Sequence, residues 1–235
     1  MSSQLIQVLN MDQRVKHVDV GAIESETTTT VDFGVDQSSS MRPHSVAMQA
    51  GLGILKNSLQ GAKECDEMVV SMTFFGSSIE TTGYQLVEDM CTDYSAGGRT
   101  LLFDTIVFIQ KNVCAYREQL KKQGIQGQSV VAFMTDGNDY GSRSRKNDAK
   151  KAIQLMQNKE MVVIFIAASD DAKGIGADLG VFDDKIIEVS KLDESSIRKI
   201  MEFVSKSART ASQNLQKGMS NGTSSAAISR GIFGV

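Results

Sequence analysis

Several features that mark common classes of protein are absent from this 235-residue sequence. It has no apolar run near the roughly 20 residues that a membrane-spanning helix needs, and its N-terminus lacks the apolar segment of a secretory signal. The three cysteines, Cys65, Cys91 and Cys114, are odd in number and unclustered. Such cysteine usage fits a reducing compartment. The sequence therefore predicts a cytoplasmic protein that does not enter a membrane.

An excess of positive charge is also lacking, and histidine is scarce. Lys and Arg total 25 against 28 Asp and Glu, so the formal net charge is −3 and no basic surface for nucleic acid is predicted. A short basic cluster between Arg143 and Lys151 is interpreted as the solvated face of a helix. The two histidines, His17 and His44, accompany no G-x-S-x-G motif. This pattern disfavours a Ser-His-Asp hydrolase.

Apolar runs and helical patterns alternate along the rest of the chain. A tight turn at Gly76–Ser78 joins two strand-like runs, so one strand of the sheet must be reversed. The alternation predicts an α/β fold with a doubly wound, mostly parallel central sheet, one antiparallel strand, and helices on both faces. The predicted strands are Val31–Val35, Met68–Phe75, Ile79–Thr82, Val130–Met134, Met161–Ala168 and Lys185–Val189, and the helical stripes are Met48–Leu59, Leu102–Val113, Ala149–Met156 and Ile197–Ala208.

The two ends of the chain differ in composition from its middle. Residues 1–27 form a predicted N-terminal extension, and residues 28–211 contain the whole strand and helix alternation. From Ser212 to Val235 the chain is rich in Ser, Gly and Asn and has little apolar area. Such composition is typical of a flexible tail, so residues 212–235 are predicted to lie outside the domain.

Five side chains with oxygen donors stand where three of these segments begin or end. Asp36, Ser38 and Ser40 follow the first strand, Thr100 precedes a helix, and Asp136 follows another strand. In open α/β sheets, ligands bind outside the carboxyl ends of the strands. Hydroxyl and carboxylate oxygens without His or Cys suit a hard divalent cation such as Mg2+. The sequence therefore predicts that the five side chains form one cation site.

Each of the three segments also has a simpler explanation when it is taken alone. Asp36, Ser38 and Ser40 could cap the following helix, and Thr100 could be an ordinary N-cap. Asp136 and the glycine after it form a common turn dipeptide. Their order, and the place of each at a strand or helix junction, favour the shared site.

The set resembles the metal-ion-dependent adhesion site of von Willebrand factor A (vWA) domains. The resemblance covers about residues 28 to 211, and Asp104 and Asp139 also look like positions of that family. Among its members, the chain looks similar to small stand-alone bacterial proteins, including those encoded with tellurium-resistance and stress systems. One departure is Ser39, where the family usually has glycine. A positive φ at this residue would strain the loop.

The resemblance implies a docking module without catalytic activity. Ser38 and Ser40 would coordinate Mg2+, or alternatively Mn2+, while Asp36 and Asp136 would act directly or through waters. Thr100 would join when a ligand is engaged. An open coordination position would accept an Asp or Glu side chain of a partner protein. Neither nucleic acid nor a membrane is an expected partner, and the residues indicate no particular oligomeric state.

Two enzyme classes are the alternatives on the same fold. Gly174, Gly176 and Gly180 could indicate a dinucleotide-binding loop, but their spacing is G-x-G-x-x-x-G and the first glycine comes about six residues after its strand. The dinucleotide fingerprint has its first glycine in the turn directly after the strand, so close packing of a helix on the sheet is the preferred explanation. A phosphatase could use Asp36 as nucleophile, but the acid/base carboxylate expected two residues later is Ser38.

Overall fold

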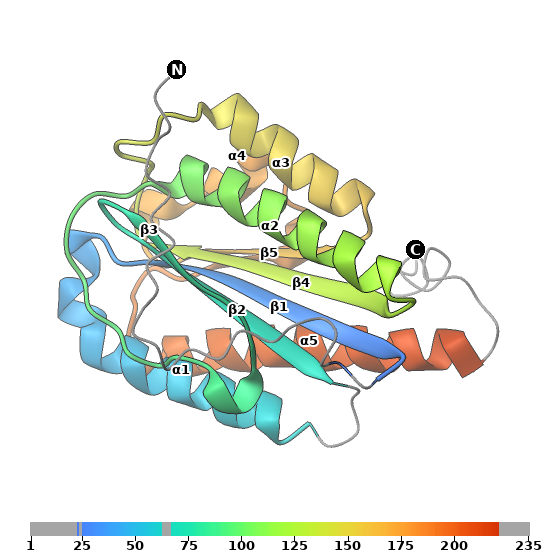
Figure 1. Ribbon diagram of the computed structural model, residues 1–235. Coiled ribbons are helices and arrows are strands. Elements are labelled where there is room, and N and C mark those ends of the chain that lie inside the picture. Colours follow the sequence, from blue (N-terminus) through green and yellow to red (C-terminus); the bar gives the residue numbers. More distant parts are fainter. Residues whose placement is uncertain (1–22, 24, 63–66, 221–235) are drawn as a thin grey trace.

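The computed structural model describes residue 23, residues 25–62 and residues 67–220. A six-stranded sheet forms the centre, and five α-helices cover its two faces (Figure 1). The strands are β1 (Thr27–Asp36), β2 (Met68–Phe75), β3 (Ile79–Leu86), β4 (Gln126–Thr135), β5 (Val162–Ala167) and β6 (Ile186–Glu188). The helices are α1 (Ser45–Gln60), α2 (Leu102–Lys122), α3 (Lys146–Asn158), α4 (Ile175–Leu179) and α5 (Glu194–Ser220).

The sheet has the strand order β3-β2-β1-β4-β5-β6. All neighbouring pairs are parallel except β2 and β3, which form the antiparallel hairpin that the turn at Gly76–Ser78 predicts. The predicted fold class is therefore confirmed. The chain passes from β1 to β2 on one side and later returns to pair β4 with the other side of β1. The strand order thus reverses between β1 and β4, where open α/β sheets form their ligand-binding crevice.

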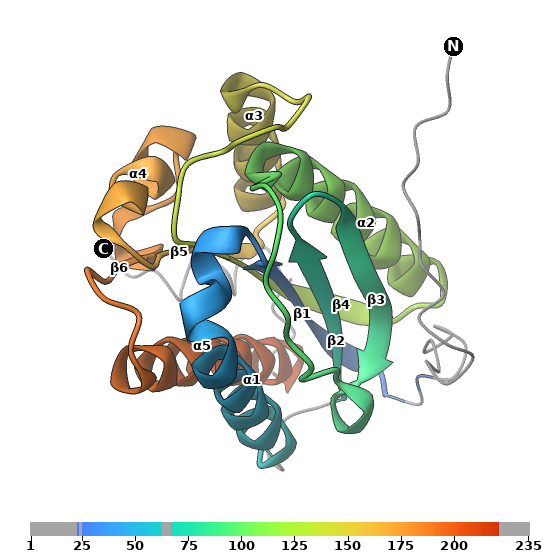
Figure 2. The same ribbon diagram turned by 90° about the vertical axis from the view of Figure 1, so that its left-hand side faces the viewer.

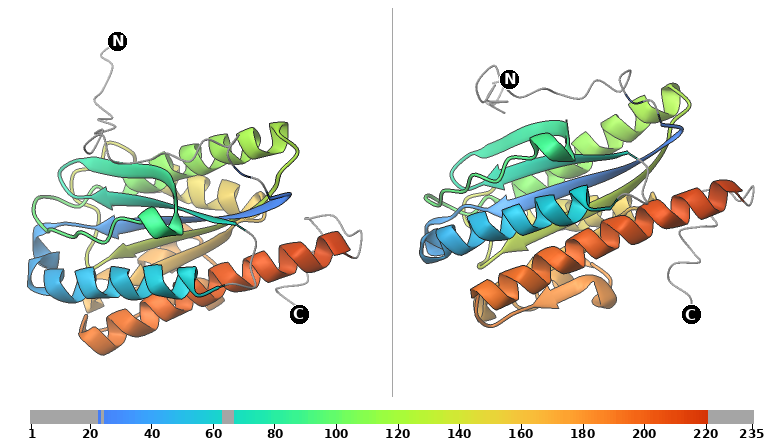
Figure 3. Two further views of the ribbon diagram at one scale, coloured as in Figure 1. Left: turned by 60° about the horizontal axis from the view of Figure 1, so that its bottom comes forward. Right: turned by 90° about the horizontal axis from the view of Figure 1, so that it is seen from below.

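Alternate residues of the central strands point into two separate cores. Val31, Phe33 and Val35 of β1 pack toward α1 and α5, which contact each other below the sheet (Figure 3). Val131 and Phe133 of β4 point the other way, into the core beneath α2, α3 and α4. Every residue of β1 is buried, as expected for a strand covered by helices on both faces. This burial fixes β1, and with it the loop that follows Asp36.

The glycine-rich segment Gly174–Gly180 packs closely against the sheet, as the sequence predicts. It forms the five-residue helix α4. A Cβ atom on Gly176 would lie only 3.0 Å from Cδ1 of Phe165 and 3.2 Å from Cγ1 of Ile186. Glycine is therefore needed at this position because the helix backbone approaches two core side chains.

The C-terminal boundary of the domain differs from the predicted one. Helix α5 continues past Ala211 to Ser220, and Ser212 and Leu215 are buried. The apolar spacing carries on through Ala208, Ala211 and Leu215, so the stripe outweighs the polar composition around it. Residues 221–235, most of the predicted N-terminal extension, His17 and Cys65 lie outside the described residues. Within the described part of the chain, no helix combines the length and apolar character needed to cross a membrane.

Candidate metal centre

Three loops meet at the edge of the sheet where the parallel strands end, the edge that faces the viewer in Figure 2. Asp36 is the last residue of β1, and Asp136 directly follows β4, which pairs with β1. The backbone carbonyls of both residues accept side-chain hydrogen bonds, Asp36 from Tyr94 and Asp136 from Ser169. The sheet and these two anchors therefore hold the two aspartates side by side.

Four of the five predicted residues form one continuous set of contacts. The backbone amide of Ser38 donates to Oδ1 of Asp36 at 2.7 Å. The hydroxyl oxygens of Ser38 and Ser40 lie 3.0 Å apart, and the Ser40 hydroxyl donates to Oδ1 of Asp136 at 2.9 Å. Residues 36 to 40 and residue 136 are thus brought together across nearly 100 positions of sequence. The structure gathers their oxygens at the switch point of the sheet.

Asp36 is a buried carboxyl group whose hydrogen bonds only partly offset its burial. Its side chain is fully buried, and Thr135 donates a hydrogen bond to Oδ2 at 2.6 Å. The pKa of Asp36 is raised to about 6, because the effect of burial outweighs the hydrogen bonds from Thr135 and Ser38, which lower it, and the nearby Asp136 carboxylate adds a smaller rise. Removing an anion from water is unfavourable unless another charge compensates it. A cation at this place would supply that compensation.

Thr100, the fifth predicted residue, lies on a separate loop beside this set. It is 8% exposed, and its backbone pairs with Tyr140 through two hydrogen bonds of 3.3 and 2.8 Å. Among the described residues, no hydrogen bond joins its hydroxyl to the other four side chains. The backbone pairing still fixes Thr100 close to the loop that begins at Asp136. Thr100 is therefore next to the oxygen cluster but separate from it.

Ser39 connects the first loop to the loop that carries Thr100. The Ser39 hydroxyl donates to the carbonyl of Gly98 at 3.2 Å and accepts from the Gly98 amide at 2.9 Å. The Ser39 amide also donates to the Gly98 carbonyl, at 3.1 Å. Ser39 does not adopt a positive φ, since Glu160 is the sole non-glycine residue with one in the described chain. The expected strain is thus absent, and the serine makes contacts that glycine could not.

Gly98 is held on its other side by the β2–β3 turn. Its φ is +96°, and a Cβ atom at this position would lie 2.4 Å from the Ser77 hydroxyl oxygen. That hydroxyl accepts a hydrogen bond from the Arg99 amide at 3.2 Å. The loop is therefore clamped between Ser39 and Ser77, directly before Thr100.

Removing the Ser39 hydroxyl should loosen this clamp without unfolding the domain. We expect Ser39→Ala to lower the free energy of unfolding by about 1 kcal/mol, the usual net effect of exposed hydrogen bonds. The Gly98 amide should exchange its hydrogen faster, because its acceptor is gone. Amide exchange measured by NMR tests this, with Ser195→Ala on the exposed first turn of α5 as the matched control. Unchanged exchange at Gly98 would show that Ser39 does not hold the loop.

Asp104 and Asp139 tie the start of α2 to the loop that follows Asp136. Oδ1 of Asp139 accepts hydrogen bonds from the Phe103 amide at 2.9 Å and from the Ser142 hydroxyl at 2.5 Å. The Asp104 carboxylate accepts from the amides of Arg143 and Ser144 at 3.0 and 2.8 Å. Both carboxylates therefore act as loop anchors. They hold the segment after Asp136 against the helix that follows Thr100.

Three residues at the centre were missed by reasoning from sequence: Thr135, Tyr94 and Ser169. Each donates a hydrogen bond to Asp36 or Asp136. Thr135 could have been found from its place beside Asp136 at a strand end. Tyr94 and Ser169 lie in loops whose patterns give no indication of their partners.

The donor set fits a hard divalent cation. It contains two carboxylates and three hydroxyls, with no nitrogen or sulfur, as Mg2+ prefers. Among the described residues, no group of three or more His, Cys, Asp and Glu side chains could hold a metal ion. A metal at this centre would therefore depend on the serine and threonine hydroxyls in addition to Asp36 and Asp136.

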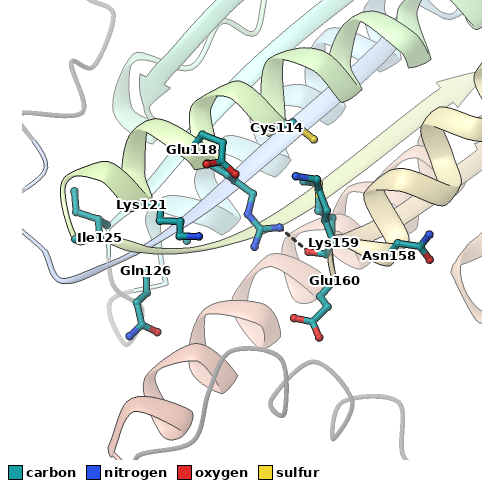
Figure 4. A pocket seen from close by; sticks show the side chains of 12 residues that line it. Cys114, Glu118, Lys121, Ile125, Gln126, Asn158, Lys159 and Glu160 are labelled. Carbon is teal, nitrogen blue, oxygen red and sulfur yellow. Dashed lines mark hydrogen bonds between the residues drawn. The ribbon is translucent and has the colours of Figure 1, made fainter.

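A cavity of about 570 Å³ lies at the opposite edge of the sheet (Figure 4). Arg117, Lys121 and Glu160 are among the residues that line it, and Arg117 donates to the backbone carbonyl of Lys159 at 2.8 Å. Helices α2 and α3 both end there, and cationic side chains are favourable at helix C-termini. The basic residues of this cavity thus have a structural role, and the cavity is remote from the oxygen cluster.

Comparisons with known proteins give a match in structure and none in sequence. The sequence matches no protein-family model and no curated protein. The pilus adhesin SpaC from Lactobacillus rhamnosus GG superposes with a TM-score of 0.62 and 11% identity, covering 78% of this chain and 30% of the adhesin. Proximal thread matrix protein 1 from the mussel byssus gives 0.54 and 15%, covering 78% of this chain and 46% of that protein. The chain thus spans less than half the length of either protein.

A third structure matches over nearly its whole length. The vWF domain of the type V pili tip protein Mfa5 from Porphyromonas gingivalis has a TM-score of 0.53 and 10% identity, covering 77% of this chain and 96% of that domain. Together with the six-stranded sheet and its single antiparallel strand, this match shows that the chain has the fold of a vWA domain.

Proposed function

We propose that this protein is a metal-dependent interaction module, which binds an Asp or Glu side chain of a partner protein through Mg2+ held at the carboxyl edge of the sheet. One observation carries the proposal. The Ser40 hydroxyl oxygen lies 3.0 Å from that of Ser38 and 2.9 Å from Oδ1 of Asp136, at the edge of the sheet where the strand order reverses. No side chain of another chemistry is needed to complete the donor set.

The residues divide into two groups by their present hydrogen bonds. Ser38, Ser40 and Asp136 share contacts among themselves, so their oxygens are close enough together to support binding of a common ligand. Asp36 already accepts hydrogen bonds on both oxygens, from the Ser38 amide and from Thr135. A carboxylate has about four acceptor positions, so Asp36 retains capacity for a metal-bound water or for the metal itself.

Charge balance explains why a partner carboxylate suits this centre. Asp36 and Asp136 together carry the charge that a divalent cation needs for neutrality. When bound, Mg2+ would supply an open coordination position that favours a further anionic oxygen. Ser38, Ser40 and Thr100 are neutral, so they orient the site without repelling an incoming carboxylate. The module needs no reacting group for this role.

The structural neighbours support the same class of function. They include a pilus adhesin, a pili tip protein and a thread matrix protein. The enzyme alternatives gain less support. Ser38 leaves Asp36 without a second carboxylate two residues later, and the glycine-rich segment is explained by the packing of Gly176 on Phe165.

Thr100→Ala separates partner binding from metal binding. The change removes one neutral oxygen, so the Mg2+-induced rise in melting temperature should persist through Ser38, Ser40 and the two aspartates. Capture of a partner at saturating Mg2+ should weaken by about 1–3 kcal/mol, the cost of one ligand contact left unmade. The measurements are a Mg2+ titration and a pull-down from the native host in Mg2+ and in EDTA.

Thr210→Ala on the exposed surface of α5 is the matched control. Equal losses of metal and partner binding would make Thr100 an ordinary structural ligand. If neither changes, the Thr100 loop does not face the metal and the docking proposal fails.

A further inference from the structure

Two exposed apolar side chains lie beside the candidate metal centre. Tyr140 is 70% exposed, although its backbone is fixed by the pairing with Thr100. Val46 is 85% exposed on the first turn of α1, which follows the short helical turn Ser39–His44 that contains Ser40. Both therefore belong to segments that also supply candidate ligands. Because the backbone is already ordered, a partner that covers these side chains does not have to order the loop as well.

Two arginines stand on the same loops. The Nη2 atom of Arg42 lies 3.8 Å from the position that a Cβ atom would have on Gly97, so the guanidinium reaches across to the loop before Thr100. Arg99 extends toward the loop that carries Tyr140, since its Cδ atom lies 3.2 Å from the position that a Cβ atom would have on Gly141. Its Cζ atom lies 5.9 Å from the centre of the Tyr140 ring. Together with the two exposed apolar side chains, the two arginines form a surface that we call the basic rim: Arg42, Arg99, Tyr140 and Val46.

No acidic side chain of the described chain neutralises the positive charges of the basic rim. Neither Arg42 nor Arg99 forms an ion pair with a described acidic residue, and both are exposed. The two arginines therefore do not neutralise Asp36 or Asp136, although they belong to the loops around them. Arg and Tyr are also the residue types that are enriched among interface hot spots.

We infer that the bound partner segment carries two acidic side chains, one for the metal and a second for the guanidinium groups of Arg42 and Arg99. An aliphatic or aromatic side chain between or beside them packs on Tyr140 and Val46. This inference rests on the proposed function, because the first carboxylate is placed by the metal. It adds the property that selects one acidic segment over another, since any exposed Asp or Glu could satisfy the metal alone.

Charge complementarity decides the kind of occupant. The carboxylate of a second acidic side chain can accept paired hydrogen bonds from an arginine guanidinium in a bidentate geometry. A basic segment would be repelled by the same arginines, and a neutral one would leave them unpaired. Because the rim is exposed, the second contact should act mainly on selectivity and association rate, and it should weaken with added salt.

The test is a selection from a random linear peptide library on the immobilised protein in Mg2+, with elution by EDTA. The expected peptides carry two acidic residues close together with an apolar residue near them. In the double variant Arg42→Gln/Arg99→Gln, binding of such a peptide should weaken about three- to tenfold, as for exposed charge pairs. Its single-acid version should bind wild type and variant alike. The Mg2+ shift in melting temperature should stay unchanged in the variant.

Lys121→Gln/Lys122→Gln at the far end of α2 is the matched control and should bind both peptides as wild type does. If EDTA-eluted peptides share only one acidic residue, or if the arginine variant binds the two-acid peptide normally, the inference is overturned and the proposed function stands. If no peptide depends on Mg2+, both are overturned.

Discussion

Asp36→Ala and Asp136→Ala should each abolish the stabilisation that Mg2+ gives to the wild-type protein. A ligand that binds only the folded state stabilises it by RT ln(1 + [L]/Kd), which is about 2.7 kcal/mol at a concentration of 100 Kd. Each variant removes one of the two charges that balance the cation, so this gain should disappear at millimolar Mg2+. The measurement is the melting temperature with and without Mg2+, repeated with Mn2+.

The metal-free variants provide a second, independent readout. Without a cation, the Asp136 carboxylate raises the pKa of the buried Asp36, so the two carboxylates repel each other. Asp136→Ala should therefore leave the metal-free protein at least as stable as wild type at neutral pH. A purely structural role would predict the opposite sign. Asp89→Ala at an exposed position is the control. A full Mg2+ response in both variants would place the metal elsewhere.

The main parts of this centre could be predicted because strand ends determine where loops meet. Asp36 and Asp136 each follow a buried apolar run, and parallel strands bring their carboxyl ends to one edge. Ser38 and Ser40 follow at short range. The structure brings these four together, and Thr100 lies beside them. The binding of metal by all five is still a prediction.

The contacts that hold the loops could not be predicted, because their partners are distant in sequence. Thr135 bonds to Asp36 across 99 positions, and Ser39 bonds to Gly98 across 59. No periodic pattern connects such pairs. The end of the domain was misplaced for a different reason, since the polar composition after Ala211 hides the apolar stripe that continues to Leu215. Average composition therefore gave the wrong boundary, because the buried positions of the helix are set by their spacing along one face.

Asp32 is another residue that the sequence did not single out. It lies in the middle of β1, is 2% exposed, and its Oδ2 atom has no hydrogen-bond partner among the described residues. The Tyr84 hydroxyl donates to Oδ1 at 2.8 Å, and the Tyr84 ring stacks on Tyr116 with centres 3.7 Å apart. Burial raises the pKa of Asp32 to about 7, with the hydrogen bond from Tyr84 acting in the opposite direction. This carboxyl group should therefore make stability depend on pH.

The sign follows from the protons bound in each state. The unfolded chain releases the Asp32 proton near its ordinary pKa of 3.8, whereas the folded protein keeps it until about pH 7. Between these values the folded state binds more protons, so the contribution of Asp32 is fully present below about pH 4 and is lost as pH rises to about 7. Asp36 acts with the same sign in metal-free protein, because its pKa is also raised. All measurements are therefore made in EDTA, with wild type and variants compared at each pH.

Asp32→Asn should remove this dependence and stabilise the protein at high pH. The asparagine side chain can still accept the hydrogen bond from Tyr84, and it stays neutral at every pH. Relative to wild type, we expect the variant to gain about 2–4 kcal/mol of unfolding free energy near pH 8 and almost nothing near pH 4. Urea denaturation across this range measures the difference.

Tyr84→Phe should act in the opposite direction, because it keeps the ring stack but removes the donor that favours the Asp32 anion. Its stability should therefore fall more steeply with rising pH than that of wild type. Parallel stability curves for Asp32→Asn and wild type would mean that Asp32 keeps an ordinary pKa in the folded protein, which would require water or another group to reach Oδ2 inside the sheet.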